Sequence, residues 1–420
     1  MKPKFIIQKI KNIFWHLPKS IFWNFYYGFP SKKLILIGVT GTDGKTTTTN
    51  LIYKILTEAG FSTGLISTLG CTIGNKTIKT GLHTTSPDPK VIQKLLREMV
   101  DGGVTHCVLE VTAHAIDQFR FFGCYFEISA ITNISHEHLD DFPTLDVYAK
   151  TKALLFSKSK IAVLNADDGY FGYIKKNITV PIITYSVNSS ADYQAKNIKL
   201  QTDSLVFTVN QKLFKTDSTY HYQIYNILIA IIISQHLKLS TKLVQKIILH
   251  FPEIKGRREI IKNNLKIRTI VDFAHTPAAL KETLTSLKIS TKGKLIVIFG
   301  ATGGRDQTKR PLMGKVVSEL SDLAYITSDD TRGESVEKIN QQIISGINQS
   351  RIKSNKFSYF DIPHRQDAFN LAVLQSGPGD TIIACGKGHE TTILLGNTEY
   401  PWSEAEAFRS AFRNRLKSND

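Results

Sequence analysis

The chain has 420 residues, of which 42% are hydrophobic, and a formal net charge of +17. At roughly 150 residues per domain, this length predicts two or three domains with sizeable cores. The four cysteines contain no Cys-x-x-Cys pair, which argues against a structural zinc site or a disulfide framework.

Residues 1–33 form a basic, aromatic N-terminal arm with seven lysines and no acidic residue. Its apolar residues follow helical spacing, but Lys9 and Lys11 interrupt any run long enough to cross a bilayer. No convincing cleavage site marks a signal peptide. Residues 1–30 could contact an anionic membrane surface as an amphipathic helix, or the arm could pack against the next domain. No nucleic-acid motif accompanies the charge, so we expect no nucleic-acid partner.

The next segment has the local pattern of a phosphate-binding loop. Residues 34–38 are apolar and predict a strand, and 46–59 have helical spacing. Between them, 38–49 read Gly-Val-Thr-Gly-Thr-Asp-Gly-Lys-Thr-Thr-Thr-Thr. Glycines let backbone N–H groups approach phosphate oxygens, Lys45 can reach the terminal phosphates, and the Thr46 hydroxyl can hold Mg²⁺. The spacing predicts an ATP-binding protein.

Beyond this loop, predicted strands and helices alternate in two stretches, which indicates an α/β protein. We expect a central P-loop ATPase domain with a mostly parallel sheet at 34–250 and a Rossmann-like α/β domain at 251–420. The short alternating segments 182–187 and 205–209 predict an antiparallel extension of the first sheet.

Polar residues follow two predicted strands of the first domain. Glu110 ends the strand at 107–111, and His138 follows the strand at 128–134. The carboxyl ends of parallel strands line the ligand crevice, so both are candidate Mg²⁺ ligands near a γ-phosphate.

Four polar clusters follow strands of the second domain, at 272–277, 300–306, 327–334 and 385–390. Two arginines and a glutamate among them could bind a zwitterion, because guanidinium groups bind carboxylate and a carboxylate binds ammonium.

Together these motifs resemble the Mur ligases, and among them the MurE-type enzymes that add the third amino acid to UDP-N-acetylmuramoyl-L-alanyl-D-glutamate. The motifs, in chain order, are Gly41-Thr-Asp-Gly-Lys-Thr-Thr-Thr48, Leu109-Glu110-Val111, Asn133-Ile-Ser with His138-Leu-Asp140, Tyr148 with Lys152-Ala-Leu-Leu-Phe156, Tyr225-Asn226, Gly256-Arg257, Asp272-Phe-Ala-His-Thr-Pro277, Lys309-Arg-Pro-Leu-Met-Gly314 and Gly386-Lys-Gly-His-Glu390. The resemblance covers about 34–410.

The resemblance implies an ATP- and Mg²⁺-dependent amide ligase of peptidoglycan precursor synthesis. Substrate carboxylate attacks the γ-phosphate, and the incoming amine then attacks the acyl phosphate. The implied catalytic residues are Lys45, Glu110, His138 and Lys152, and the implied metal ligands are Thr46, Glu110, His138 and Lys152, the lysine in its carbamylated form. Nucleotide contacts are implied for Gly41, Thr42, Gly44, Lys45, Thr46, Thr47, Asn226, Arg257, Asp272 and His275.

For the substrates, the resemblance implies that Thr84 and Thr85 hold the nucleotide-sugar peptide. Arg305, Asp330, Arg332, Gly386 and Glu390 fall on positions that bind the incoming amino acid. The diaminopimelate enzymes have Asp-Asn-Pro-Arg where this chain has Asp-Asp-Thr-Arg at 329–332, so the arginine for the distal carboxylate is kept. This favours meso-diaminopimelate over lysine.

The N-terminus departs from the family, because only about 33 residues precede the first strand where a uridine-binding domain is expected. Two alternatives follow: a Mur-like ligase with another acceptor, of the folylpolyglutamate, polyglutamate or cyanophycin kind, or a non-catalytic nucleotide-binding subunit. Retention of Lys45, Glu110, His138 and Lys152 argues against the second. We expect a cytoplasmic monomer that uses small-molecule substrates.

Overall fold

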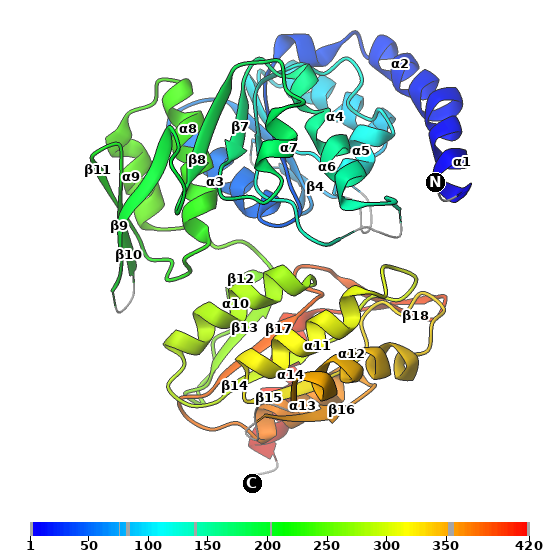
Figure 1. Ribbon diagram of the computed structural model, residues 1–420, viewed down its shortest axis with the longest axis vertical. Coiled ribbons are helices and arrows are strands. Elements are labelled where there is room, and N and C mark those ends of the chain that lie inside the picture. Colours follow the sequence, from blue (N-terminus) through cyan, green and yellow to red (C-terminus); the bar gives the residue numbers. More distant parts are fainter. Residues whose placement is uncertain are drawn as a thin grey trace. The chain divides into compact units, whose positions relative to one another are not determined.

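The computed structural model describes residues 3–74, 76–80, 85–137, 141–201, 204–351 and 357–417. The chain divides into two compact units, one of 1–135 and 141–252 and the other of 136–140 and 253–420 (Figure 1). Each unit has its own sheet. No described helix is long and apolar enough to cross a membrane.

The first unit is built on an 11-stranded sheet with the order β11-β10-β9-β8-β7-β6-β1-β5-β2-β3-β4. Pairing is parallel from β9 through β2, and antiparallel in β9-β10-β11 and β2-β3-β4. The strands are β1 (Ile35–Thr40), β2 (Thr63–Ser67), β3 (Gly70–Ile73), β4 (Lys76–Ile78), β5 (His106–Glu110), β6 (Phe126–Ile131), β7 (Ala162–Asn165), β8 (Ile182–Ser186), β9 (Tyr193–Gln201), β10 (Ser204–Val209) and β11 (Lys212–Thr216).

Helices cover both faces of this sheet, as the continuous apolar strands require. Ile37 and Val39 of β1 pack with α3, α8 and α9, while Leu36 faces the opposite core with α4. The helices are α3 (Lys45–Glu58), α4 (Pro89–Asp101), α5 (Ala113–Asp117), α6 (Leu145–Ala153), η3 (Phe156–Lys158), α7 (Phe171–Lys175), α8 (Gln223–His236) and α9 (Thr241–Leu249).

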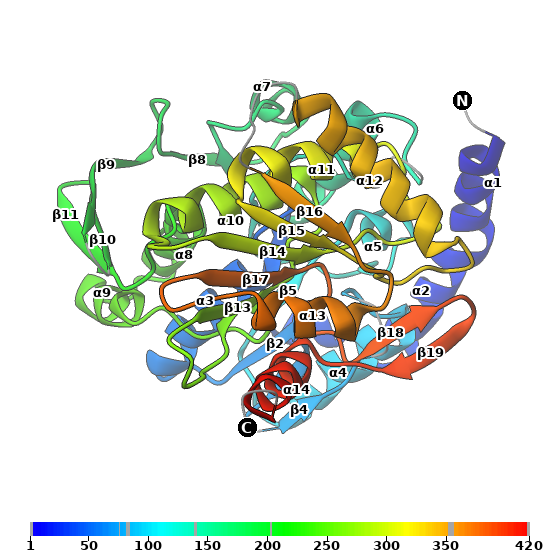
Figure 2. The same ribbon diagram turned by 90° about the horizontal axis from the view of Figure 1, so that it is seen from below.

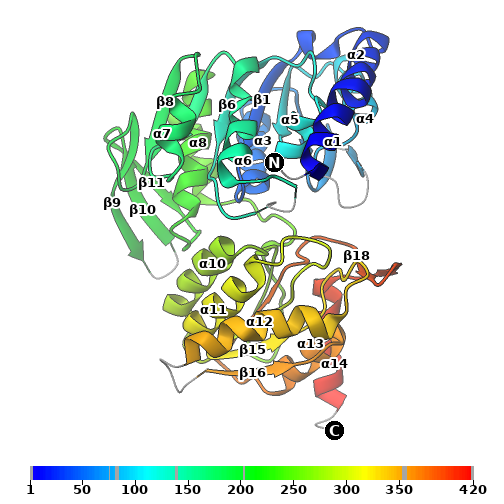
Figure 3. The ribbon, with the colours of Figure 1, turned by 45° about the vertical axis from the view of Figure 1, so that its right-hand side comes forward.

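The N-terminal arm is helical. It consists of α1 (Pro3–Lys11), a π-helical turn η1 (Asn12–His16), α2 (Leu17–Tyr26) and the 3₁₀ turn η2 (Pro30–Lys33). The α2 helix packs beside α4, and Figure 3 shows α1 and α2 as the outermost helices of this unit. Of the two alternatives for the arm, the structure thus shows packing of α2 on the next domain.

The second unit has a six-stranded sheet with the order β12-β13-β17-β14-β15-β16, parallel except for β12. Helices α13 and α14 lie on the opposite side of it from α10, α11 and α12 (Figure 2). Its elements are β12 (Arg257–Ile260), β13 (Arg268–Asp272), α10 (Pro277–Ser290), β14 (Leu295–Phe299), α11 (Lys309–Leu320), β15 (Leu323–Ile326), α12 (Val336–Arg351), β16 (Ser358–Asp361), α13 (Arg365–Leu374), β17 (Thr381–Cys385), the hairpin β18 (Thr392–Leu395) and β19 (Thr398–Pro401), and α14 (Glu404–Lys417).

This architecture confirms the predicted α/β class, with a mostly parallel first sheet and a Rossmann-like second one. One detail of the prediction is wrong: the strand at 182–186 pairs in parallel with β7, so the antiparallel extension begins only between β9 and β10. The short run at 182–187 carried no signal for strand direction, because direction depends on which strand lies next to it.

Candidate active site

The phosphate loop joins the carboxyl end of β1 to the first residue of α3, Lys45. Gly44 precedes this helix in the left-handed region with φ 84°. A Cβ there would lie 2.7 Å from Oδ1 of Asn226, and a Cβ on Gly41, with φ 138°, would lie 1.8 Å from Oγ1 of Thr132. These two glycines are therefore required by both backbone angle and space.

The loop is held from the neighbouring strand end, just after β6. Asn133 Oδ1 accepts from the backbone N of Asp43 at 3.0 Å, and Thr132 Oγ1 donates to the Asp43 carbonyl at 2.6 Å. The backbone N of Ser135 donates to Thr42 Oγ1 at 3.0 Å. These bonds fix the loop shape and leave the start of α3 available to an anion, since the first N–H groups of a helix have no intrahelical partners.

Glu110 lies beside this helix start, at the end of β5 and only 1% exposed. Its Oε2 accepts from Thr46 Oγ1 at 3.0 Å and from the backbone N of Thr68 at 2.9 Å. The Thr68 hydroxyl lies 3.0 Å from the hydroxyl of Thr85. The structure thus brings Thr46, Glu110 and Thr85 together, with Thr68 between them.

Two lysines lie at the same loop. Lys45 Nζ donates to the Thr42 carbonyl at 2.7 Å, and the buried Lys152 Nζ donates to the Gly41 carbonyl at 2.6 Å. Lys152 also lies over the Tyr148 ring, 4.5 Å from its centroid. The amino groups of Lys45, from the start of α3, and of Lys152, from α6, therefore both contact the loop that the sequence connects with phosphates.

Asn226, on α8, joins this group from far along the chain. Its Oδ1 accepts from Thr48 Oγ1 at 3.0 Å, and its Nδ2 donates to Gln223 Oε1 at 2.6 Å. Since Asn226 also lies against Gly44, α8 borders the phosphate loop directly.

The donors at this site fit a magnesium ion. Mg²⁺ prefers oxygen ligands, takes one or two carboxylates with substrate phosphates, and keeps several waters. The Glu110 carboxylate and the Thr46 hydroxyl, 3.0 Å apart, supply such donors. The described part of the chain has no group of three or more His, Cys, Asp and Glu residues suited to a metal.

Of the expected site residues, Thr84 and His138 lie outside the described residues.

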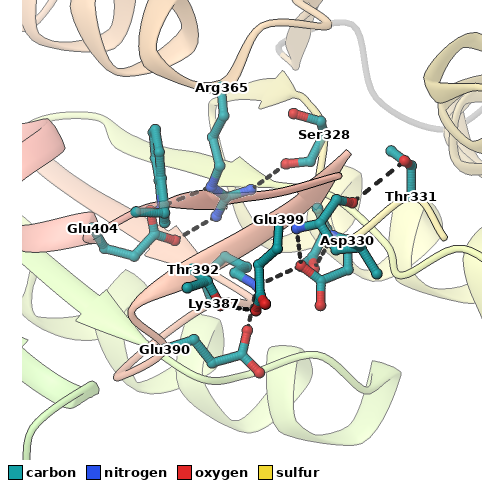
Figure 4. A network of polar contacts seen from close by, with 12 residues as sticks. Ser328, Asp330, Thr331, Arg365, Lys387, Glu390, Thr392, Glu399 and Glu404 are labelled. Carbon is teal, nitrogen blue, oxygen red and sulfur yellow. Dashed lines mark hydrogen bonds and ion pairs between the residues drawn. The ribbon is translucent and has the colours of Figure 1, made fainter. Parts of the chain in front are cut away.

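The four polar clusters of the second unit follow β13, β14, β15 and β17, which are adjacent in its sheet. Asp330 and Glu390 both form ion pairs with Lys387, whose side chain is fully buried (Figure 4). Lys387 Nζ lies 2.7 Å from Asp330 Oδ1, which also accepts from the backbone N of Leu394 at 2.9 Å. Burial lowers the pKa of Lys387, but the nearby carboxylates of Asp329, Glu390 and Asp330 outweigh it and hold this pKa above its ordinary value.

A second buried ion pair supports the same strand ends. Arg365, at the start of α13, pairs with Glu404 of α14 (Figure 4). Its guanidinium also donates to the carbonyls of Ser328, at 2.8 Å, and Cys385, at 3.0 Å. One arginine thereby ties together the segments that follow β15 and β17.

Arg332, two residues beyond Asp330, has a left-handed backbone with φ 47°. Its Nε is buried and has no hydrogen-bond partner among the described residues. Gly386 is equally constrained: with φ 110°, its Cβ would lie 2.6 Å from Oδ2 of Asp329. Arg305 lies half-buried in the segment after β14.

The residues expected at the nucleotide from this unit gather around Phe273. The Arg257 guanidinium lies 4.1 Å from the Phe273 ring centroid, and His275 Nδ1 lies 2.8 Å from the Phe273 carbonyl. Asp272 accepts from the backbone N of Arg258 at 2.8 Å, and burial raises its pKa. Burial, with the positive Arg257 nearby, lowers the pKa of His389 to about 3, and its ring lies against Phe273.

Several residues of these sites were not singled out from the sequence. Thr68 carries no charge and no motif, and only its place after β2 could have indicated it. Lys387 lies within a recognised cluster, but its role as the cation between two carboxylates depends on Asp330. Arg365 is distant from the Cys385 carbonyl in sequence and gave no signal.

Comparison with known proteins places this geometry in a family. The Mur ligase middle domain matches residues 39–234, and the Mur ligase glutamate ligase domain matches 256–388. The UDP-N-acetylmuramoyl-L-alanyl-D-glutamate–2,6-diaminopimelate ligase 1 of Clostridium acetobutylicum is 36% identical over 387 residues, 91% of this chain and 78% of that protein. The corresponding ligase of Nostoc sp. is 38% identical over 403 residues, 93% of this chain and 80% of its own length.

Comparison with solved structures shows the same fold. A UDP-N-acetylmuramoyl-L-alanyl-D-glutamate–2,6-diaminopimelate ligase is 28% identical with a TM-score of 0.64, and the match covers 95% of this chain and 83% of that one. Folylpolyglutamate synthase of Mycobacterium tuberculosis, complexed with ADP and AMPPCP, is 15% identical with a TM-score of 0.72 over 94% of this chain and 95% of that one, which shows a common fold. The chain belongs to the Mur ligase family and is an ATP-dependent amide ligase.

Proposed function

We propose that this enzyme joins meso-diaminopimelate to the D-glutamate carboxylate of UDP-N-acetylmuramoyl-L-alanyl-D-glutamate. The observation that carries the proposal is the Glu110–Thr46 pair at the phosphate loop, in a chain 36–38% identical to enzymes named for this reaction. ATP and nucleotide sugars are cytoplasmic compounds, so we place the reaction in the cytoplasm. We also treat the enzyme as a monomer.

The first step transfers the γ-phosphoryl group to a carboxylate oxygen, which forms an acyl phosphate and releases ADP. Two anions must approach one another, so positive charge and N–H donors at the loop lower the barrier. In the proposal, Lys45 and the backbone of 41–47 hold the phosphates. Mg²⁺ held by Thr46 and Glu110 would neutralise phosphate charge, and the other proposed ligand from the sequence is His138.

Lys152 has a conditional role in this proposal. A free ammonium group repels a cation, so Lys152 can ligate Mg²⁺ only after carbamylation converts it to an anion. The contact of its unmodified Nζ with the Gly41 carbonyl, at 2.6 Å, supports a role at the phosphate loop. Thr84 and Thr85 are proposed to hold the nucleotide-sugar peptide, and Asn226 the adenine.

The second step is attack by the amine of diaminopimelate on the acyl carbonyl, after which inorganic phosphate leaves. Asp330 and Glu390 are proposed to bind the ammonium group, and Arg305 and Arg332 the carboxylates, near Gly386. The unpartnered, buried Nε of Arg332 supports this, because a buried donor without a partner is a favourable site for a carboxylate. Arg257, Asp272 and His275 are proposed to contact the nucleotide.

Phosphate release by the purified chain tests the reaction. It is measured with ATP, the nucleotide-sugar dipeptide and, one at a time, meso-diaminopimelate, L-lysine and L-glutamate. We expect release only when the dipeptide and meso-diaminopimelate are both present. Release with a folate acceptor and glutamate would overturn the proposed acceptor while leaving the ligase chemistry intact.

The role of Arg332 has its own test. Diaminopimelate carries a distal carboxylate that Arg332 is proposed to bind, so Arg332→Ala should lower kcat/KM for diaminopimelate about 10-fold or more. Arg409→Ala is the matched control, because Arg409 is a surface arginine paired with Glu406. An unchanged kcat/KM for diaminopimelate in Arg332→Ala would show that another group binds the distal carboxylate.

A further inference from the structure

The N-terminal helices have their polar and apolar faces reversed relative to an ordinary surface helix. Surface helices turn an apolar stripe towards the core and polar residues towards water. In α1, η1 and α2 the fully buried side chains are instead polar: Asn12, Ser20 and Asn24 are each at most 1% exposed.

Most of the large apolar side chains of the same helices face solvent, whereas Phe5, Leu17 and Trp23 are partly buried. Phe14 is 76% exposed, Phe25 73% and Ile7 65%. The other exposed members of this apolar face are Ile6, Ile10, Ile13, Trp15, Ile21, Phe22 and Tyr26. A contiguous exposed apolar surface of this kind marks an interaction site, whereas single exposed apolar residues need no explanation.

Polar contacts fix the helices in this orientation. Asn12 Nδ2 donates to Asp117 Oδ2 at 2.5 Å, and Lys9 forms an ion pair with the same carboxylate. Lys19 Nζ lies 2.6 Å from Asp88 Oδ2, at the N-terminus of α4. These bonds attach the polar face to the first unit, and the apolar side chains named above are left exposed.

The charge of the arm indicates what covers this face. Residues 1–33 hold seven lysines and no acidic residue, and Lys11, Lys32 and Lys33 are exposed. Isoleucine with tryptophan and tyrosine is typical of helices that lie in a lipid interface, and lysines add attraction to anionic headgroups.

We propose that α1, η1 and α2 bind the surface of an anionic lipid bilayer, with the apolar face defined above inserted into the headgroup region. The polar face stays attached to the first unit through Asn12 and Lys19. Binding of this face holds the ligase at a membrane surface. The proposal concerns location and is independent of which amino acid or acceptor the enzyme uses.

Co-sedimentation of the full chain with vesicles tests this. We expect binding to vesicles with about a third phosphatidylglycerol, weaker binding at high salt, and little binding to phosphatidylcholine alone. Trp15 is 63% exposed, so its fluorescence should shift to the blue when bound. The triple variant Ile7→Ser, Phe14→Ser, Phe25→Ser should bind about 10-fold or more weakly, because it removes inserted apolar surface.

A matched control substitutes equally exposed apolar residues elsewhere: Leu213→Ser, Ile260→Ser and Ile289→Ser, which are 59%, 60% and 68% exposed. This control should bind vesicles like the unsubstituted chain. All variants should keep their ligase activity on soluble substrates. The proposal is overturned if the unsubstituted chain does not bind anionic vesicles or if the triple arm variant binds them equally well. It is also overturned if Ile7, Phe14 and Phe25 mediate self-association of the chain in place of lipid binding.

Discussion

The phosphate loop of the first unit and the charge network of the second are built by different means. At the loop, backbone groups and threonine hydroxyls supply much of the polarity, and Glu110 accepts hydrogen bonds from Thr46 and Thr68. In the second unit, the buried Lys387 pairs with the buried Asp330 and with Glu390, which is partly exposed. A buried ion network depends on every partner, because the loss of one leaves an uncompensated charge.

The largest effect is expected when that network loses its cation. Lys387→Met leaves the buried Asp330 without its cation and close to the partly exposed Glu390, and the free energy of unfolding should fall by about 3–5 kcal/mol. Urea unfolding of the full chain measures it. Lys315→Met, which removes an exposed lysine 4.0 Å from Glu319, should change stability by less than about 0.5 kcal/mol. Equal stability of both variants would contradict the buried network.

Lys45→Ala tests the loop, where the expected loss is catalytic. Removing a group that stabilises transferring phosphoryl charge typically costs about 10²–10³-fold in kcat, and folding should be unaffected. Steady-state phosphate release measures this. Lys54→Ala, on the solvent side of the same helix and paired with Glu58, is the control and should keep full activity. A comparable loss in both variants would remove Lys45 from the mechanism.

His389 should make the free energy of unfolding depend on pH. Burial lowers its folded pKa to about 3 from the ordinary value of 6.5. The unfolded chain therefore takes up a proton first, so this contribution to stability is complete above pH 6.5 and declines as pH falls towards 3. The slope should reach at most about 1.4 kcal/mol per pH unit.

His389→Gln should lessen this slope in urea unfolding measured through that pH range. His250→Gln, whose side chain is 79% exposed, should leave the slope unchanged. If His389→Gln follows the pH dependence of the unsubstituted chain, the buried neutral histidine is not the source of the slope.

The smallest effect is expected at the loop glycine. Gly44→Ala forces a side chain into a left-handed backbone, which costs about 1–2 kcal/mol, and adds a contact with Asn226. Gly60→Ala has a similar φ of 87° but no atom within 4 Å, so it carries the backbone strain alone. Only Gly44→Ala should also weaken ATP binding, measured by calorimetry. Equal ATP affinity in the two would show that Asn226 does not confine the loop.

The two sites also differ in how far the sequence could predict them. The loop is contiguous, and its strand, glycines, lysine and helix follow one another at 35–58, so local pattern was sufficient. Glu110 was found because it ends a strand. Its partner Thr68 was not, because an uncharged residue after β2 becomes informative only once β2 lies beside β5.

The site in the second unit could not be predicted from local sequence, because it depends on pairing between distant segments. The four polar clusters were recognised individually, but Arg365 and Glu404 are 39 residues apart and meet in the core. The reversed faces of α2 were likewise beyond the sequence, since helical spacing gives the two faces but not which one meets α4.

By itself, the sequence determined the two α/β folds and the strand, loop and helix at 35–58, because these depend on local backbone geometry and on the period of apolar residues. Only the tertiary structure decided that Lys387 joins Asp330 to Glu390 and that the arm turns its apolar face outward. Both depend on which strand ends and helix faces become neighbours, and that choice is made by packing across the whole unit.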